Sequence, residues 1–294
     1  MILSYKIHNV APYINWIYFF HAWGFQPRFA AIANIHGCDV CRASWLTTFP
    51  EEDRSKASEA MQLFKEANRM LDSLDKDYEV KTIFKLCKAN SDGDNLVIEK
   101  GTNQSIIFPL LRQQTPKRDG SPFLCLSDFI RPLSSGIPDT IGAFASSIDA
   151  DMEGLYQQDP YKHLLVQTLS ATEKMHEYVR KEAWGYAKDE SLSMSDLLVE
   201  KYQGIRPAVG YPSLPDQSIN FLLDELLDMK QIGITLTENG AMYPHASVCG
   251  LMFAHPASEY FSVGKIGEDQ LEDYARRRGK SMEEMRKFLA ANLQ

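Results

Sequence analysis

GIRPAVGYP occupies residues 204–212 of the chain and is followed at once by SLP. Pro207 and Pro212 each fix φ and remove one N–H donor from the backbone. They also push the residues that precede them, Arg206 and Tyr211, toward extended geometry. The stretch therefore predicts a stiff, extended loop with unpaired carbonyls. This loop would present the guanidinium of Arg206 and the aromatic ring of Tyr211.

Two glycines add to the character of this loop. Gly204 can end a helix in a left-handed turn. Gly210 has no side chain, so a ligand or another segment can approach the backbone closely there. Composition alone leaves two roles open: a rigid connector between a helix and the next element, or a binding loop.

Arg-Pro-Ala-x-Gly-Tyr-Pro resembles the signature loop of the activation domain of cobalamin-dependent methionine synthase. The resemblance spans roughly residues 10 to 293 and is strongest after residue 180. Further matches follow in order along the chain: Leu111–Gln114, Asp139–Ala145, Trp184–Ala187, Leu236–Glu238, Ala241–Pro244, His255–Pro256, Glu259–Phe261 and Glu272–Arg277. Several ordered motifs in one chain are more specific than any one of them.

Strands grouped in blocks, with helices between the blocks, predict an α+β fold rather than alternating βαβ units. The resemblance implies a C-shaped single domain, here residues 1–294, with a central, mainly antiparallel β-sheet and flanking helices. Residues 30–50 fit the family poorly and are expected to be an insertion.

Periodicity and turn residues predict most of the elements. Short apolar runs separated by turns predict a β-meander over residues 80–110 and a hairpin of residues 246–254 and 259–266. Further strands are expected at 123–126 and 141–144. Helices are expected at 55–76, in one long run from Pro160 to Ala183, and at 195–202, 218–231, 268–278 and 281–289, the last opened by a capping box.

Charge and composition exclude several classes of function. The net charge is −8 and the pI is about 5.4, which argues against nucleic acids or anionic membranes as the main partner. No stretch approaches the ~20 apolar residues of a membrane span. Residues 13–25 lack the basic start and cleavage site of a signal peptide. We therefore expect a cytoplasmic protein with reduced thiols.

The segment from residue 12 to residue 29 is rich in aromatic residues. An isolated segment cannot bury so many rings, so it must dock on a core or on a partner. The resemblance implies that this segment lies close to the attachment of the cobalamin-binding domain.

Cys38-Asp39-Val40-Cys41 forms a C-x-x-C pair within the expected insertion. Such a pair can be a redox dithiol or half of a zinc site. A structural zinc needs two more ligands, and only His36 is near in sequence. We therefore expect two thiols without a metal.

Other catalytic machinery is not evident in the sequence. The seven His residues are scattered, and neither Gly-x-Ser-x-Gly, His-Glu-x-x-His nor a phosphate-binding P-loop occurs. The dinucleotide fingerprint Gly-x-Gly-x-x-Gly is also missing. The Asp-x-His-x-x-Gly motif of cobalamin-binding domains is absent, so any cobalamin is expected to come from another chain.

The resemblance implies binding of S-adenosylmethionine and assigns its contacts. Asp139 matches the acidic contact to the amino-acid part of the ligand; the alternative is a turn or strand-end residue after Pro138. Arg206 matches the residue that binds the carboxylate, where a planar fork suits better than Lys. Ala208 and Gly210 match main-chain contacts to adenine.

Tyr260 and Phe261 match an adjacent aromatic pair, usually Tyr-Tyr, that borders the ligand in the family. Because residue 261 is Phe in this chain, the pair has one hydroxyl instead of two. The other interpretation of Tyr260 is an aromatic residue on a sheet face.

One expected carboxylate is displaced. Where the family has a Glu on the long helix, this chain has Leu169, with Glu173 one turn later. Either a neighbour substitutes or the ligand is held less tightly. Tyr211, Glu238 and His255 are further candidates for contact with ligand or partner.

The function implied is that of an activation module. It would bind S-adenosylmethionine and present its methyl group to cobalamin carried by a partner methionine synthase chain, after a one-electron donor such as flavodoxin has reduced the cobalt. One alternative is a corrinoid-protein docking or chaperone module with weak or no affinity for this ligand. Another is a thiol–disulfide protein that uses Cys38 and Cys41.

Overall fold

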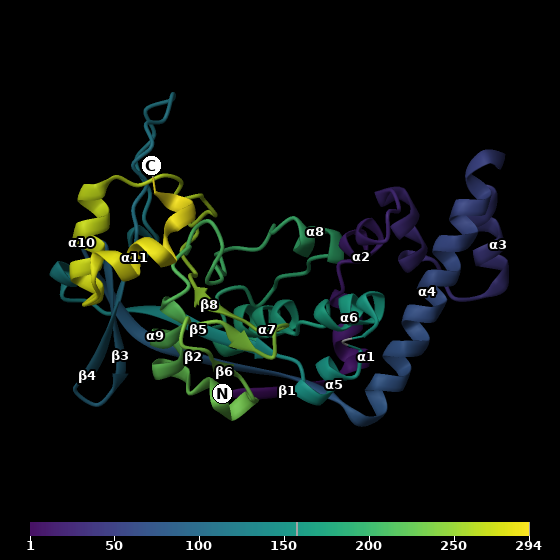
Figure 1. Ribbon diagram of the computed structural model, residues 1–294, viewed down its shortest axis with the longest axis horizontal. Coiled ribbons are helices and arrows are strands. Elements are labelled where there is room, and N and C mark those ends of the chain that lie inside the picture. Colours follow the sequence, from purple (N-terminus) through teal and green to yellow (C-terminus); the bar gives the residue numbers. More distant parts are fainter. Residues whose placement is uncertain (157, 294) are drawn as a thin grey trace. The chain divides into compact units, whose positions relative to one another are not determined.

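The computed structural model describes residues 1–156 and 158–293. The chain divides into two compact units, which are described separately (Figure 1). The first unit comprises Met1–Leu3, Thr82–Ser147 and Thr172–Gln294, and the second comprises Ser4–Lys81 and Ile148–Ala171.

A six-stranded sheet organises the first unit. Five strands lie in the order β4-β3-β2-β5-β8, and β1 pairs with β2. The strands are β1 (Ile2–Lys6), β2 (Glu79–Asp92), β3 (Asn95–Gly101), β4 (Gln104–Pro109), β5 (Asp139–Ser147) and β8 (Val248–Met252). The pairs β2–β3, β3–β4 and β5–β8 are antiparallel. The predicted central antiparallel sheet is confirmed, as is the meander over residues 80–110.

The same unit contains several helices. They are α7 (Thr172–Tyr178), a π-helical turn (Val179–Ala183), α8 (Met194–Leu198), α9 (Ile219–Leu227), α10 (Glu268–Arg278) and α11 (Met282–Phe288). A two-stranded sheet pairs β6 (Thr235–Leu236) with β7 (Met242–Tyr243). Short 3-10 turns occupy Leu126–Phe129, Leu133–Ser135, Met229–Ile232 and Ala290–Asn292.

The predicted caps of α10 and α11 are present. Gly279 ends α10 in the left-handed region, with φ of 63°. Ser281 accepts a bond from the Glu284 N–H and its own N–H bonds the Glu284 carboxylate, which is the predicted capping box.

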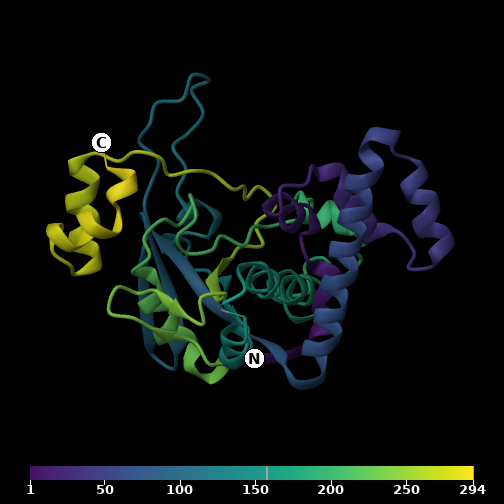
Figure 2. The ribbon, with the colours of Figure 1, turned by 45° about the vertical axis from the view of Figure 1, so that its right-hand side comes forward.

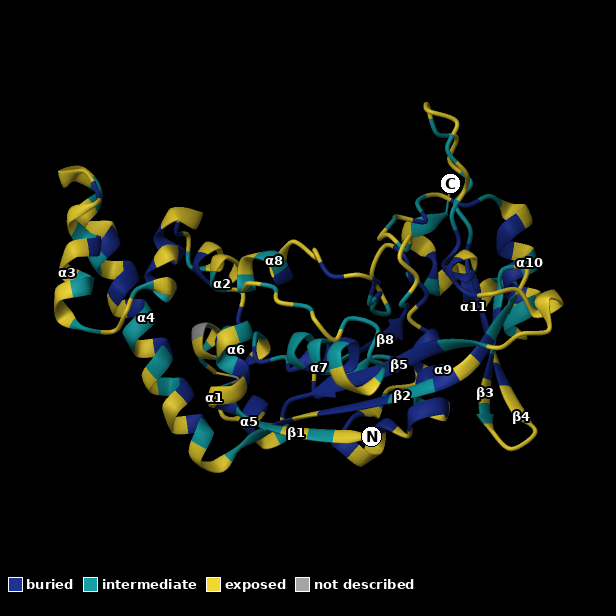
Figure 3. Ribbon diagram, turned by 180° about the vertical axis from the view of Figure 1, so that it is seen from behind, coloured by how far each residue is buried: buried dark blue, intermediate teal, exposed yellow. Residues whose placement is uncertain are grey.

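The second unit is helical. It contains α1 (Ile7–Val10), α2 (Trp16–Ala22), α3 (Asp39–Thr47), α4 (Glu51–Asp77), α5 (Ala150–Gly154) and α6 (Pro160–Gln167), with 3-10 turns at Ala11–Tyr13 and Pro27–Asn34. The predicted helix at 55–76 lies within α4, along which buried and exposed residues alternate (Figure 3). α3 packs beside α4 (Figure 2). Phe19 and Phe20 of the aromatic segment are buried within this unit.

Three predicted elements are wrong. Residues 123–126 form no strand, because Asp128 accepts the Cys125 N–H and the chain turns into a 3-10 helix. The run from Pro160 to Ala183 is not one helix. It breaks after Gln167, where the Thr168 hydroxyl bonds the Leu165 carbonyl and competes with the helical backbone pattern.

The expected hairpin across His255 is the third. Residues 259–266 form no strand of their own. Instead the Val263 N–H bonds the Pro212 carbonyl at 2.9 Å and the Ile266 N–H bonds the Asn292 carbonyl at 2.8 Å. β8 pairs with β5 rather than with this segment.

No helix within the described ranges is long and apolar enough to cross a membrane.

The loop at 204–212 is attached to β8 by its backbone. Ile205 and Phe253 exchange two hydrogen bonds of 2.9 Å, and the Leu251 N–H bonds the Pro207 carbonyl at 3.1 Å. The expectation of unpaired carbonyls is therefore wrong: besides Ile205 and Pro207, the carbonyls of Ala208, Tyr211 and Pro212 accept backbone N–H groups, from Tyr211, Leu214 and Val263. The extended geometry imposed by the prolines lets the loop pair like an edge strand.

Gly250 makes this close pairing possible. A Cβ at residue 250 would lie 2.2 Å from the Pro207 oxygen and 2.8 Å from the Ala208 Cα. We expect Gly250→Ala to lower the free energy of unfolding by about 1–3 kcal/mol or more, the cost of overpacking against backbone. Urea unfolding measures this change.

Gly101→Ala is the matched control, because nothing lies within 4 Å of a Cβ built there. It should change the free energy of unfolding by less than about 1 kcal/mol. Equal stability of the two variants would show that the loop does not depend on its contact with β8.

Candidate functional site

The loop and β8 border a cavity of about 610 Å³ in the first unit. Residues from the loop, from the segment before it, from β8 and from the 260–262 segment line it. They are Glu200, Arg206, Pro207, Ala208, Tyr211, Pro212, Ser213, Val248, Tyr260, Phe261 and Ser262. The cavity is therefore built from segments that the backbone pairing of the loop brings together.

Arg206 is the cation of this cavity, and its side chain is 17% exposed. Its guanidinium donates to the Glu173 carboxylate at 2.7 Å. Burial alone would lower the pKa of Arg206, but the charge of Glu173 raises it above its ordinary value. Its Nε is buried and has no hydrogen-bond partner among the described residues. A buried donor without a partner is costly, and the carboxylate of an anionic ligand would satisfy it.

Glu173 lies between two arginines. Besides its bond to Arg206, it lies 3.7 Å from Arg180, whose side chain is fully buried. Arg180 donates to Glu190 at 2.7 Å and to Nδ1 of His176 at 2.7 Å. The buried network fixes Glu173, and Glu173 in turn orients Arg206.

Tyr260 holds the backbone of Arg206. Its hydroxyl accepts the Arg206 N–H at 2.8 Å and lies 3.4 Å from the Tyr202 hydroxyl. Burial raises the pKa of the Tyr260 hydroxyl. Tyr260 therefore stays protonated at neutral pH and positions the loop in addition to lining the cavity.

Five of the predicted site residues line the cavity: Arg206, Ala208, Tyr211, Tyr260 and Phe261. Two more stand close to it along the chain or through a contact. Gly210 precedes Tyr211, and nothing in the described residues lies within 4 Å of a Cβ built on it. Glu173 reaches the cavity through Arg206.

Three predicted residues do not line the cavity. Asp139 opens β5, and its two carboxylate oxygens accept the N–H groups of Arg131 and Thr140 at 2.9 and 2.7 Å. Glu238 is exposed between β6 and β7, and His255 accepts the Ala257 N–H at 3.2 Å.

Sequence reasoning missed several residues of the site. Glu200, Ser213 and Ser262 line the cavity but belong to no motif. Arg180 is the clearest omission, because a fully buried arginine is rare unless paired. Its position within an otherwise amphipathic stretch gave no signal of burial.

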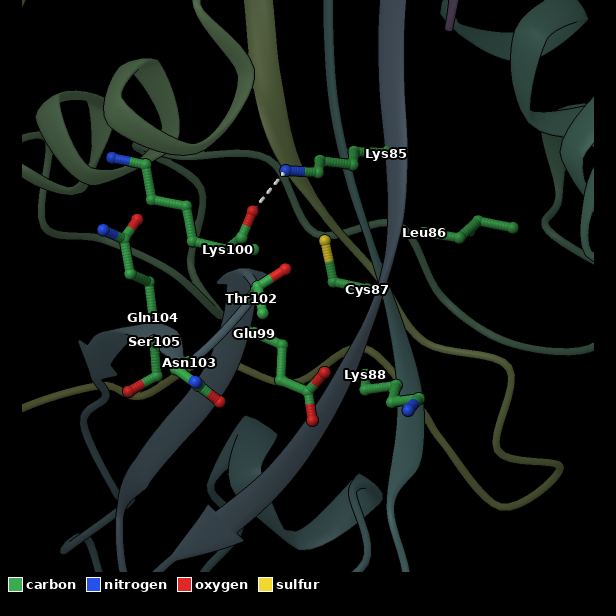
Figure 4. A pocket seen from close by; sticks show the side chains of 11 residues that line it. Lys85, Leu86, Cys87, Lys88, Glu99, Lys100, Thr102, Asn103, Gln104 and Ser105 are labelled. Atoms are coloured by element: carbon green, nitrogen blue, oxygen red, sulfur yellow. Dashed lines mark hydrogen bonds between the residues drawn. The ribbon is translucent and has the colours of Figure 1, made fainter.

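A second cavity, of about 620 Å³, lies over the strands β2, β3 and β4 (Figure 4). Lys85 there donates to the Lys100 carbonyl at 3.0 Å. It contains none of the predicted site residues. We therefore assign the candidate site to the cavity at Arg206.

The antiparallel sheet, the loop paired to β8 and the cavity beside it define an α+β domain with a polar and aromatic site. The model of the family described as vitamin B12 dependent methionine synthase, activation domain, matches residues 6–279. The chain belongs to this family, as its motifs predict.

A solved structure, the crystal structure of the MetH reactivation domain bound to AdoHcy, is 37% identical to the chain. The similarity covers 100% of this chain and 90% of that one, with a TM-score of 0.85. The predicted fold is confirmed by this similarity.

The buried network beside Arg206 leads us to expect that folding stability depends on pH. Burial first, and then the charges of Arg206 and Arg180, lower the pKa of His176 well below its ordinary value. The folded protein therefore keeps His176 neutral, whereas the unfolded chain binds a proton below about pH 6.5. Folding stability is thus lost as the pH falls through that value.

We expect the wild type to lose about 1.4 kcal/mol more than His176→Asn between about pH 7.5 and pH 5.5. An Asn oxygen can still accept the bond from Arg180, so the variant removes the titration and keeps an acceptor. Urea unfolding at each pH measures the difference. Parallel losses in both proteins would show that His176 is not held neutral.

Proposed function

We propose that the chain binds S-adenosylmethionine in the cavity at Arg206 and presents its methyl group to cobalamin carried by a partner methionine synthase chain. The observation that carries the proposal is the pairing of Arg206 and Glu173 at the cavity. Membership of the activation-domain family and similarity to a domain bound to AdoHcy support it.

The amino-acid part of the ligand suits this pair. Its carboxylate would bind the Arg206 fork, whose Nε is without a partner in the described parts of the chain. Its ammonium would bind Glu173, which is held between two arginines. A zwitterion can thus replace part of the internal ion pair without leaving a buried charge unpaired. On the basis of the family resemblance, Asp139 remains a predicted contact of the ligand's amino-acid part.

The adenine would meet the loop backbone. Pro207 O and Val209 N bond β8, so the N–H of Ala208 points to the opposite side of the loop, as in any extended pairing. Gly210 leaves space beside it. Tyr260 and Phe261 would border the ligand, as the family pattern implies.

Such a site needs no general base. The sulfonium is already a good leaving group, so the protein's contribution is to hold the donor in line with its acceptor. Reduced cobalamin on the partner would supply the nucleophile, and a one-electron donor such as flavodoxin would supply the electron. The residues of this chain bind and orient the donor.

Arg206→Ala tests the proposal. We expect it to weaken both S-adenosylmethionine and S-adenosylhomocysteine by roughly 1.5–3 kcal/mol, because each ligand carries the carboxylate and loses a charge-assisted bond. Isothermal titration calorimetry on the folded variant gives this value.

Arg276→Ala serves as the control, since that side chain is 73% exposed on α10 and away from the cavity lining. It should bind both ligands as the wild type does. Wild-type affinity in a folded Arg206→Ala protein would remove Arg206 from the site. Absence of binding in the wild type would favour the docking-module alternative.

A further inference from the structure

The start of α3 brings three metal-binding side chains together outside the Arg206 site. A ring nitrogen of His36 and the sulfurs of Cys38 and Cys41 all lie within 4.8 Å of one another. The three residues come from six consecutive positions, and both cysteines are partly exposed. The sequence left His36 as a neighbour in the chain only; the fold turns it toward both thiols.

Local backbone geometry builds this cluster. Cys38 is the N-cap of α3, and its sulfur accepts the Cys41 N–H at 3.3 Å. The sulfurs of Cys38 and Cys41 are 2.8 Å apart. A helix N-terminus favours negative charge, so it stabilises the thiolate forms that bind metals.

We propose that His36, Cys38 and Cys41 bind a soft divalent cation of the zinc class, with water at the fourth position. One imidazole and two thiolates are the donors that zinc prefers, and three protein ligands with one open position are an established form of zinc site.

The distances fit after a small adjustment. Two sulfurs at ~2.3 Å from a tetrahedral zinc lie about 3.8 Å apart. Rotation of the two partly exposed side chains can supply the additional separation from 2.8 Å. Asp39 does not complete the site, because its exposed carboxylate lies toward Arg42 at 3.9 Å.

His36 distinguishes this site from a simple dithiol. A disulfide between Cys38 and Cys41 makes no use of an imidazole, whereas a metal site requires a third donor. The other cysteines, Cys87, Cys125 and Cys249, are buried as single thiols. Among the described residues, this is the group of His, Cys or carboxylate side chains whose spacing suits a metal ion.

Cobalt titration tests the proposal on the whole chain. The protein is reduced, stripped with a chelator, freed of reductant under argon and titrated with Co²⁺. We expect one equivalent to produce thiolate-to-cobalt charge-transfer absorption and the visible bands of tetrahedral Co²⁺, and Zn²⁺ to abolish both. Loss of one donor should weaken Zn²⁺ binding at least about 100-fold, since even outer-sphere changes cost 10- to 100-fold.

Variants assign the signal. Cys41→Ser and His36→Ala should each lose the tetrahedral spectrum, whereas His21→Ala and Cys87→Ser, which alter residues outside the cluster, should keep it. Absence of the spectrum in the wild type would overturn the proposal. So would a spectrum that survives in Cys41→Ser, or a Cys38–Cys41 disulfide that forms in air equally fast with and without Zn²⁺.

Discussion

Backbone pairing between the loop at 205–209 and β8 is the constraint on which the rest of the site depends. It buries Ile205 and lets Arg206, Pro207 and Ala208 line the cavity. Two glycines permit the approach. A Cβ on Gly204 would lie 2.3 Å from the Phe253 oxygen, and Gly250 faces Pro207 equally closely. Side chains at positions 204 and 250 would prevent the loop from pairing with β8.

Electrostatics then decide what the cavity can hold. The chain carries a net charge of −8, yet its candidate site presents a mostly buried arginine. Glu173 compensates that charge. Arg180, which is paired with Glu190, lies next to Glu173 and holds it in position. A buried pair is costly to break on one side only. The arrangement therefore favours a ligand with both signs of charge over a simple anion or cation.

Local patterns predicted much of the fold. The helix at 55–76, the meander and the caps at Gly279 and Ser281 follow from periodicity, turn residues and cap chemistry. Two failures come from local side-chain hydrogen bonds, those of Asp128 and Thr168, and the third comes from distant partners. Residues 259–266 look like a strand, but their donors bond Pro212 and Asn292.

The site shows the same division. Arg206 and Ala208 were predicted from their motif, and Glu173 was a candidate, but the contact between Glu173 and Arg206 spans 33 positions and follows from no local pattern. Leu169, placed in the family's Glu position, is fully buried, and Glu173 supplies the carboxylate beside Arg206.

A crystal structure of the chain with S-adenosylhomocysteine would test the central claim most directly. We expect the ligand carboxylate within hydrogen-bond distance of the Arg206 guanidinium, the ammonium on Glu173 and the adenine against the backbone of Ala208. Ligand density elsewhere, with the bond between Arg206 and Glu173 unchanged, would contradict it.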